Sequence, residues 1–332
     1  MIRFGLVGIG KFGKNYLRLL QDMPGITLVA VAASSEKTLK EIQVADAIKK
    51  TTNAEEIFHD SSIDAMIIAT PTKIHFTLAS SALKQGKHVL LEKPMTATLE
   101  EAEALAGIVK DSGKILMIGH QYCYNDHIRL LKQKLDSGFF GKIHYIHAEH
   151  FYTFPLTGNT GCFWETATHE FAILDYLFGG FSIEQKFARF EDFFKKGRDD
   201  FANVSFAINS KAYSQILENI GIGNASQAMI PVTVLTSWCA PEKIRRFSVV
   251  GEKGAAVFDE MRNKEKPLRL YKAEIDGGEY AEVTVKNGVT REPLQNELEH
   301  FISCIEEHRE PFTDYRHGLR ITKHLDTFTQ IL

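Results

Sequence analysis

Short apolar runs alternate with amphipathic stretches over the first 120 residues of the chain. The apolar runs are rich in Val, Ile and Leu and predict buried strands, whereas the stretches between them have helical spacing. The predicted strands are 2–7, 27–33, 65–69, 88–91 and 115–118, and the predicted helices are 14–21, 36–49, 74–85 and 99–111. Regular alternation of strand and helix predicts a doubly wound parallel sheet with helices on both faces.

The pattern changes after about residue 120, where longer runs mix polar and apolar residues. Such mixing is typical of a largely antiparallel open sheet with one face covered. The predicted strands are 143–152, 202–209, 214–220, 232–239, 247–250, 268–272 and 281–285, and the predicted helices are 126–137, 164–178, 293–307 and 315–332. We therefore expect an α/β domain over residues 1–121 and an α+β domain over residues 122–332.

Length, charge and cysteine content narrow the class of protein. A chain of 332 residues is long enough for two domains, and its net charge of −3 gives no basic field for nucleic acid. No apolar run reaches the ~18–20 residues of a membrane span. The N-terminal run 1–7 lacks the basic region and cleavage site of a signal peptide, and the four cysteines form no CxxC pair. These features favour a cytoplasmic protein that binds neither membrane nor nucleic acid.

A glycine-rich turn follows the first predicted strand. Residues 8–13 read Gly-Ile-Gly-Lys-Phe-Gly, which is the GxGxxG spacing of a dinucleotide site in its expected strand–turn–helix context. Gly8 permits a tight turn, Gly10 lets the backbone approach a pyrophosphate, and Gly13 lets helix pack on strand. Lys11 and Phe12 complete the loop. The alternative is a glycine turn that binds no ligand.

The end of the second predicted strand bears on the choice of dinucleotide. NAD enzymes place an acid here to accept from the ribose hydroxyls, but this chain has Ala33 followed by Ser34, Ser35 and, two residues on, Lys37. Hydroxyls and a lysine tolerate a 2′-phosphate, so we favour NADP(H) over NAD(H). Two alternatives stay open: Glu36 could be a displaced acid, and the serines could simply cap the next helix.

Polar residues also follow the strand at 65–69. Thr70 and Pro71 lie at the carboxyl edge of the sheet, where ligands bind in open α/β folds, and His75 comes one turn later. We expect these three residues near the cofactor. In the alternative interpretation Pro71 only starts a helix and His75 is a surface residue.

The strand at 88–91 runs into Glu92-Lys93-Pro94, again at the carboxyl edge. A lysine here could stabilise the charge that develops on a substrate oxygen as hydride leaves carbon. The Lys93–Pro94 bond is a candidate cis peptide. Without further information, a strand-end ion pair of Glu92 with Lys93 explains the two residues equally well.

A second candidate for catalysis lies in the predicted helix 164–178. Glu165 and His169 are four residues apart and share a helix face, so the carboxylate could orient the imidazole as a general base. The alternative is a buried histidine with a purely structural hydrogen bond. His144, His147 and His150 alternate between the faces of a predicted strand, which is poor geometry for a shared metal, and we expect no metal site.

Several motifs together resemble one known family, the glucose–fructose oxidoreductase/inositol dehydrogenase/rhizopine catabolism (Gfo/Idh/MocA) group. The resemblance covers nearly the whole chain. It is carried by the GxGxxG turn, Ala69-Thr70-Pro71, the run 82–94 (ALKQGKHVLLEKP), Gly119-His120, the run 137–143 (SGFFGKI), and the C-terminal runs 297–301 (ELEHF) and 310–314 (EPFTD). It implies a Rossmann domain followed by a substrate-binding α+β domain, with Lys93 and Glu92 near the nicotinamide.

The resemblance also suggests roles for residues of the second domain. The family's Asp-x-x-x-His helix is matched by Glu165 and His169, and a subgroup with Trp-Asp-x-x-x-His-Asp is matched further by Trp164 and Glu170. Many members have Arg-Phe-x-Pro after Gly-His, but this chain has the run 123–126 (Cys-Tyr-Asn-Asp). Tyr124 and Asn125, with Trp164 and Glu170, are therefore the expected substrate contacts.

Taken with the family, these residues predict an NAD(P)-dependent oxidoreductase. His169 would take the proton of a substrate hydroxyl, Lys93 would hold the same oxygen, and Glu165 would orient His169. The implied substrate is a sugar, an inositol or a nucleotide-sugar, and the implied assembly is a homodimer or homotetramer through the C-terminal sheet. Alternatives are a non-catalytic dinucleotide sensor and a dehydrogenase of a dihydrodiol or tetrapyrrole.

Overall fold

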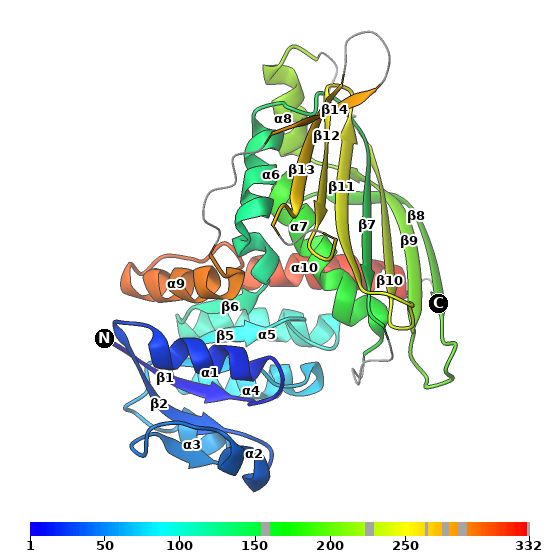
Figure 1. Cartoon of the computed structure of the whole chain (residues 1–332). Coiled ribbons are helices and arrows are strands. Elements are labelled where there is room, and N and C mark those ends of the chain that lie inside the picture. The colour runs from blue at the N-terminus through cyan, green and yellow to red at the C-terminus, as the bar shows by residue number, and fades with distance from the viewer. Residues whose placement is uncertain (154–159, 223–228, 263–264, 274–278, 285–290, 331–332) are drawn as a thin grey trace. The chain divides into compact units, whose positions relative to one another are not determined.

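A computed structural model describes the chain apart from 154–159, 223–228, 263–264, 274–278, 285–290 and 331–332 (Figure 1). The chain forms two compact units. The first contains Met1–Gln121 and Pro293–Thr322, and the second contains Tyr122–Glu292 and Lys323–Leu332. The domains predicted from the sequence, 1–121 and 122–332, stay predictions, and the first compact unit contains residues 293–322 as well as 1–121.

The first unit contains a six-stranded parallel sheet in the order β3-β2-β1-β4-β5-β6. The strands are β1 (Ile2–Val7), β2 (Ile26–Ala32), β3 (Lys49–Thr51), β4 (Ala65–Ile68), β5 (His88–Glu92) and β6 (Leu116–Gly119). The direction of strand order reverses between β1 and β4, and such a switch point opens a crevice at the carboxyl ends of the strands. The predicted doubly wound parallel sheet is confirmed.

Helices connect these strands much as the sequence predicts. They are α1 (Gly13–Asp22), α2 (Glu36–Glu41), α3 (Glu55–Phe58), the 3₁₀ turn η1 (Thr72–Ile74), α4 (His75–Lys84) and α5 (Leu99–Ser112). The predicted helix 36–49 is wrong in its second half, because the backbone is extended at Ile42 and short strand β3 begins at Lys49. The prediction also missed α3, which is a single turn.

The C-terminal residues join the first unit through specific contacts. They form α9 (Pro293–Glu306) and the first part of α10 (Tyr315–Thr329). The Phe301 ring lies 6.2 Å from the ring of Phe4 on β1. The chain at Thr313 pairs with Ile118 of β6, whose N–H donates to the Thr313 carbonyl at 2.8 Å. These contacts are non-local, so the position of residues 293–322 could not be inferred from their helical pattern.

The second unit contains an eight-stranded sheet in the order β14-β13-β12-β11-β7-β10-β9-β8. Among the strands that the structure describes here, only β7 and β10 run parallel, and every other neighbouring pair is antiparallel. The strands are β7 (Ile143–Phe151), β8 (Ser182–Glu191), β9 (Phe201–Asn209), β10 (Ile230–Ser237), β11 (Ile244–Gly251), β12 (Gly254–Asp259), β13 (Leu268–Ala273) and β14 (Tyr280–Val283). The predicted largely antiparallel sheet is therefore confirmed.

Helices of the second unit cover one face of this sheet, as Figure 1 shows for α6 and α7. The helical segments are η2 (Gln121–Tyr124), α6 (Asp126–Asp136), the π-helical turn η3 (Phe163–Ala167), α7 (Thr168–Phe178) and α8 (Lys211–Asn219). The predicted helix 164–178 thus begins with a π turn, a feature often found at functional sites.

Three predictions for this unit are wrong or incomplete. The predicted strand 214–220 is part of α8, because Ser210 caps the helix and Tyr213 and Leu217, four residues apart, are both buried. Strand β8 was missed because its side chains are mostly exposed and polar, as on many edge strands. Strand β12 was also missed, because it begins with Gly and Ala, which have low strand propensity.

The apolar residues of β10 are covered by the chain itself. Val232 and Val234 are buried, and Trp238 just beyond the strand is 1% exposed with its indole N–H donated to Thr166. The alternate position Thr233 faces the other side, 3.3 Å from Ser205. The apolar side chains Val232, Val234 and Trp238 are therefore buried within the chain itself. Among the described residues, no helix is long and apolar enough to cross a membrane.

Candidate active site

The glycines of the turn between β1 and α1 differ in whether the surrounding chain leaves room for a side chain. A Cβ on Gly8, which has φ of 94°, would lie 2.4 Å from the carbonyl oxygen of Ala69, and a Cβ on Gly13 would lie 1.9 Å from that of Gly8. The chain itself therefore requires both glycines. At Gly10, in contrast, a Cβ would meet nothing within 4 Å. The open space beside Gly10 is what the approach of a pyrophosphate requires.

A cavity of about 420 Å³ lies at this turn, at the carboxyl ends of β1, β2 and β4. Five predicted cofactor residues line it: Gly8, Gly10, Ser34, Thr70 and Pro71. Its other lining residues are Val7, Ile9, Ala32, Ala33, Thr38, Thr52, Ala54, Ala69, Ile74 and Leu78. The position, at a sheet switch point, and the mostly apolar lining fit a dinucleotide. Thr38 and Thr52 were missed by the sequence analysis, the latter because it follows the unpredicted strand β3.

The residues after β2 divide between the cavity and helix α2. Ser34 lines the cavity, whereas Ser35 is the N-cap of α2 and accepts a hydrogen bond from the Thr38 N–H at 3.3 Å. Lys37 is on the exposed side of α2, where its ammonium lies 3.9 Å from Glu41. No acidic residue is among those that line the cavity. Ser34 and Thr38 are thus the hydroxyls that face the ligand space at the end of β2.

Lys93 follows β5 at the carboxyl edge of the same sheet. The Lys93–Pro94 bond is cis, as predicted, and the Lys93 side chain is half-buried. Its backbone N–H donates to Glu92 at 3.2 Å. His75 is fully buried, with Nδ1 2.8 Å from the Pro94 carbonyl and Nε2 2.8 Å from the Thr70 carbonyl. His75 therefore connects the loop that lines the cavity to the turn that carries Lys93.

In the second unit, His169 lies in the first turn of α7 and is 4% exposed. Two aromatic rings surround it: His150 of β7 stacks on it with centroids 5.4 Å apart, and Tyr122 meets it edge-on at 5.1 Å. Glu165, the predicted orienting acid, lies in the π turn and accepts a hydrogen bond from the Thr160 hydroxyl at 2.7 Å. The imidazole is thus held between rings and shielded from bulk water.

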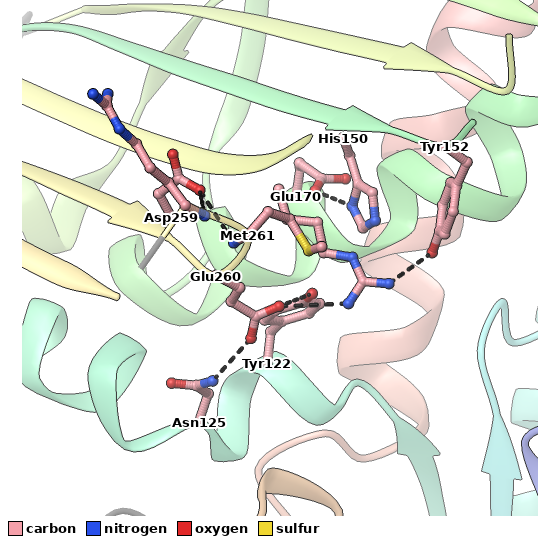
Figure 2. A network of polar contacts seen from close by, with 10 residues as sticks. Tyr122, Asn125, His150, Tyr152, Glu170, Asp259, Glu260 and Met261 are labelled. Atoms are coloured by element: carbon pink, nitrogen blue, oxygen red, sulfur yellow. Dashed lines mark hydrogen bonds and ion pairs between the residues drawn. The ribbon is translucent and has the colours of Figure 1, made fainter. Parts of the chain in front are cut away.

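His150 and Glu170 form a buried carboxylate–imidazole pair. Nδ1 of His150 donates to Oε1 of Glu170 at 2.8 Å, and both side chains are over 90% buried (Figure 2). Nε2 of His150 has no hydrogen-bond partner among the described residues. In a neutral imidazole whose hydrogen is on Nδ1, Nε2 is an acceptor. The sequence analysis considered His150 only as a metal ligand and assigned Glu170 to substrate directly, so this pair was missed.

A second polar cluster lies next to this pair (Figure 2). Glu260, just after β12, accepts from the Tyr122 hydroxyl at 2.9 Å and from Arg245 and Asn125 at 3.5 Å each. Arg245 also donates to the Tyr152 hydroxyl at 3.4 Å. Burial raises the pKa of Tyr122 well above its usual range, so its hydroxyl remains a donor. Arg245 pairs across the sheet with His150, which places both on the helix-covered face.

The other predicted substrate contacts are Asn125, Tyr124 and Trp164, and each is buried in the second unit. Asn125 is the N-cap of α6 and accepts from the His127 N–H at 2.9 Å. Tyr124 is fully buried, with the Arg129 guanidinium 5.7 Å from its ring centre, and Trp164 is 6% exposed. Asn125 is also hydrogen-bonded to the polar cluster, through Glu260.

The three clustered histidines of β7 have separate surroundings. His144 is exposed, His147 lies 3.7 Å from Glu149, and His150 is paired with Glu170. Within the described parts of the chain, no group of three or more His, Cys, Asp or Glu side chains is placed to hold a metal ion.

Comparison with known proteins identifies the family. Residues 2–120 match the model of an oxidoreductase family with an NAD-binding Rossmann fold, and residues 132–330 match that family's C-terminal α/β domain. The uncharacterised oxidoreductase YdgJ of Escherichia coli is 34% identical over 43% of this chain and 41% of its own length. The scyllo-inositol 2-dehydrogenase (NAD⁺) of Bacillus subtilis is 29% identical over 54% of each chain. The matched stretches thus span only about half the length of these two relatives.

Solved structures support the fold. The UDP-N-acetylglucosamine 3-dehydrogenase of Acidithiobacillus ferrooxidans superposes with a TM-score of 0.78 at 22% identity, over 98% of this chain and 96% of that one. The two family models together match residues from both units of the chain. The chain belongs to the Gfo/Idh/MocA family of oxidoreductases, as its motifs predicted.

Proposed function

We propose that this protein is an NAD(P)-dependent dehydrogenase or reductase. Its substrate would be a sugar, an inositol or a nucleotide-sugar that is oxidised at a hydroxyl carbon or reduced at a ketone. The observation that carries the proposal is the cavity at the switch point of the parallel sheet, where Gly10 faces open space that the protein does not fill. Relatives named for inositol oxidation support the substrate class.

When bound, the nicotinamide cofactor supplies hydride chemistry, and the protein supplies position and charge. In oxidation, His169 takes the proton of the substrate hydroxyl while the carbon-bound hydrogen leaves as hydride. Lys93 donates a hydrogen bond to the same oxygen and stabilises its developing negative charge. Glu165 positions His169. In reduction, His169 returns the proton to that oxygen.

The polar groups around His169 suggest how a polyhydroxylated substrate is held. Nε2 of His150 is an acceptor without a partner among the described residues, and a neighbouring hydroxyl of the substrate would supply the missing donor. Arg245 and Tyr152 add donors on the same face of the sheet. A ring with several adjacent hydroxyls matches this set of donors and acceptors better than an apolar diol does.

We propose NADP(H) as the favoured cofactor. The support is the absence of a carboxylate from the cavity lining and the presence of Ser34 and Thr38 at the end of β2. Lys37, three residues after Ser34, is the nearest cation along the chain and could reach toward a 2′-phosphate if it left Glu41. We also propose a cytoplasmic homodimer or homotetramer, on the family resemblance alone.

The test is a turnover screen of sugars, polyols and nucleotide-sugars with both dinucleotides, followed by nicotinamide absorbance. We expect one substrate class to be turned over and NADP(H) to be bound more tightly. If only dihydrodiols were turned over, the substrate would be a dihydrodiol and not a sugar, an inositol or a nucleotide-sugar. Tight dinucleotide binding without turnover of any alcohol or ketone would point to a sensor and overturn the proposal.

A further inference from the structure

Three buried polar side chains that are not among the lining residues of the cavity meet in the first unit. Tyr16 comes from α1, Glu92 from the end of β5, and Glu297 from α9. Tyr16 and Glu297 are fully buried and Glu92 is 7% exposed. The Tyr16 hydroxyl oxygen lies 2.8 Å from Oε1 of Glu92 and 2.8 Å from Oε1 of Glu297. Both distances are those of good O–H···O hydrogen bonds.

The number of protons follows from these two contacts. Each contact needs one hydrogen between its oxygens, and the Tyr16 hydroxyl carries only one. If both carboxyls were ionised, one pair of oxygens would face each other with lone pairs only, and two negative charges would be buried side by side. The second hydrogen must therefore sit on one of the two carboxyls.

The surroundings show which carboxyl holds it. Oε2 of Glu92 accepts from the Lys93 N–H at 3.2 Å, so both of its oxygens act as acceptors when Tyr16 donates to Oε1. Oε2 of Glu297 is buried and has no partner among the described residues. If Glu297 were ionised, its buried Oε2 would carry negative charge without a hydrogen-bond donor. If Glu297 is a neutral acid, Oε2 is only an unpaired carbonyl oxygen, which costs less.

The titration behaviour agrees with this assignment. Burial raises the pKa of Glu297 well above its usual range, and the Glu92 carboxyl raises it further. Burial also raises the pKa of Glu92, to about 7, while the Tyr16 hydrogen bond and the Lys93 charge act in the opposite direction. Of the two carboxyls, Glu297 is thus the one that stays protonated.

We infer that Glu297 is a neutral acid that donates to Tyr16, that Tyr16 donates to an ionised Glu92, and that this chain of hydrogen bonds positions Lys93. Three features fit the inference. The charged end accepts the backbone N–H of Lys93. The Tyr16 ring contacts Phe12 of the glycine turn at 5.7 Å. Gly119 leaves room for the carboxylate, because a Cβ there would lie 3.0 Å from Oε1 of Glu92.

Infrared spectroscopy of the folded protein tests the proton assignment directly, because a protonated carboxyl has its own C=O stretching band. At mildly alkaline pH, where Glu92 is ionised, the wild type should show this band, and Glu297→Gln should lack it. Glu92→Gln should keep it, as should Glu306→Gln, a control at an exposed position of the same helix. A band lost from Glu92→Gln but kept in Glu297→Gln, or no such band at all, would overturn the assignment.

A further variant keeps the test open if Glu297→Gln does not fold. Tyr16→Phe should shift the band, because the acid loses its acceptor, and an unshifted band would contradict the inference.

The positioning role rests on the proposed function of Lys93 and is tested by turnover. Glu92→Gln cannot accept from both donors, and its kcat should fall about tenfold, as for the loss of one typical hydrogen bond.

A merely structural role for Glu92 predicts a lower melting temperature with unchanged kcat in the folded fraction, and that result would overturn the positioning role. The infrared result needs no turnover. It therefore stands or falls independently of whether the protein is a dehydrogenase.

Discussion

The two units of the chain present their polar groups in different ways. In the first unit the cofactor cavity is lined by backbone, glycines and small side chains that follow three neighbouring strands. In the second unit the groups around His169 are large side chains from separate elements, and Tyr122 is hydrogen-bonded to Glu260 across 138 residues of sequence. The first arrangement suits a ligand whose shape is the same in many enzymes, and the second can vary with the substrate.

The largest effect is expected from the second unit. His169→Ala should lower the rate of hydride transfer about 10²–10⁴-fold, the usual contribution of a positioned proton-transfer group. Glu165→Gln should cost less, because the proton acceptor stays in place. Dinucleotide affinity, measured by fluorescence titration, should not change in either variant. A folded His169→Ala protein with wild-type kcat would remove His169 from the mechanism.

Two glycines of the first unit separate ligand binding from stability. Gly10→Val should weaken dinucleotide binding by about 10–100-fold, which corresponds to the roughly 1–3 kcal/mol cost of overpacking, because its side chain would occupy the open space. Its melting temperature without cofactor should stay near wild type. Gly13→Val should instead destabilise the fold, because a Cβ there would lie 1.9 Å from the Gly8 carbonyl oxygen. Equal destabilisation by both would mean that the space beside Gly10 is not a ligand site.

The same cavity predicts the cofactor preference. Ala33→Asp places a carboxylate at the end of β2, where it would accept from a ribose hydroxyl and repel a 2′-phosphate. We expect the ratio of NADP(H) to NAD(H) affinity to fall about tenfold or more, the effect of one charge-assisted hydrogen bond. Wild type that prefers NAD(H), with no change in the variant, would show that Ala33 does not face the ribose.

How much the sequence could predict differs between the units for a physical reason. Gly8, Gly10 and Gly13 act through local backbone geometry, so their spacing and the flanking strand were enough to predict the glycine turn beside the cavity. Lys93 and its cis proline are also local to one turn. The Glu170–His150 pair joins α7 to β7, and Arg245 reaches Tyr152 from another strand. Only the register of β7 with β11 shows that these residues share a face.

The smallest effect concerns the Tyr16 cluster of the first unit. Because the pKa of Glu297 is raised above the unfolded value of 4.5, its contribution to stability is full below that pH and is lost as pH rises toward the folded pKa. The free energy of unfolding of the wild type, relative to Glu297→Gln, should therefore fall by up to about 1.4 kcal/mol per pH unit. Urea unfolding across neutral pH measures this slope. A difference that does not change with pH would show that Glu297 is ionised in the folded protein.

The central proposal is that Lys93 and His169 act on one substrate oxygen, as the family resemblance implies. The most direct test measures hydride transfer in Lys93→Met, in His169→Ala and in the double variant, with stability and cofactor affinity determined on the same samples. Lys93→Met should cost about 10²–10³-fold, as does the loss of a charge-stabilising donor. The double variant should lose less than the product of the single losses, because both groups serve one transition state. Losses that simply multiply, or full activity in folded Lys93→Met, would contradict the account.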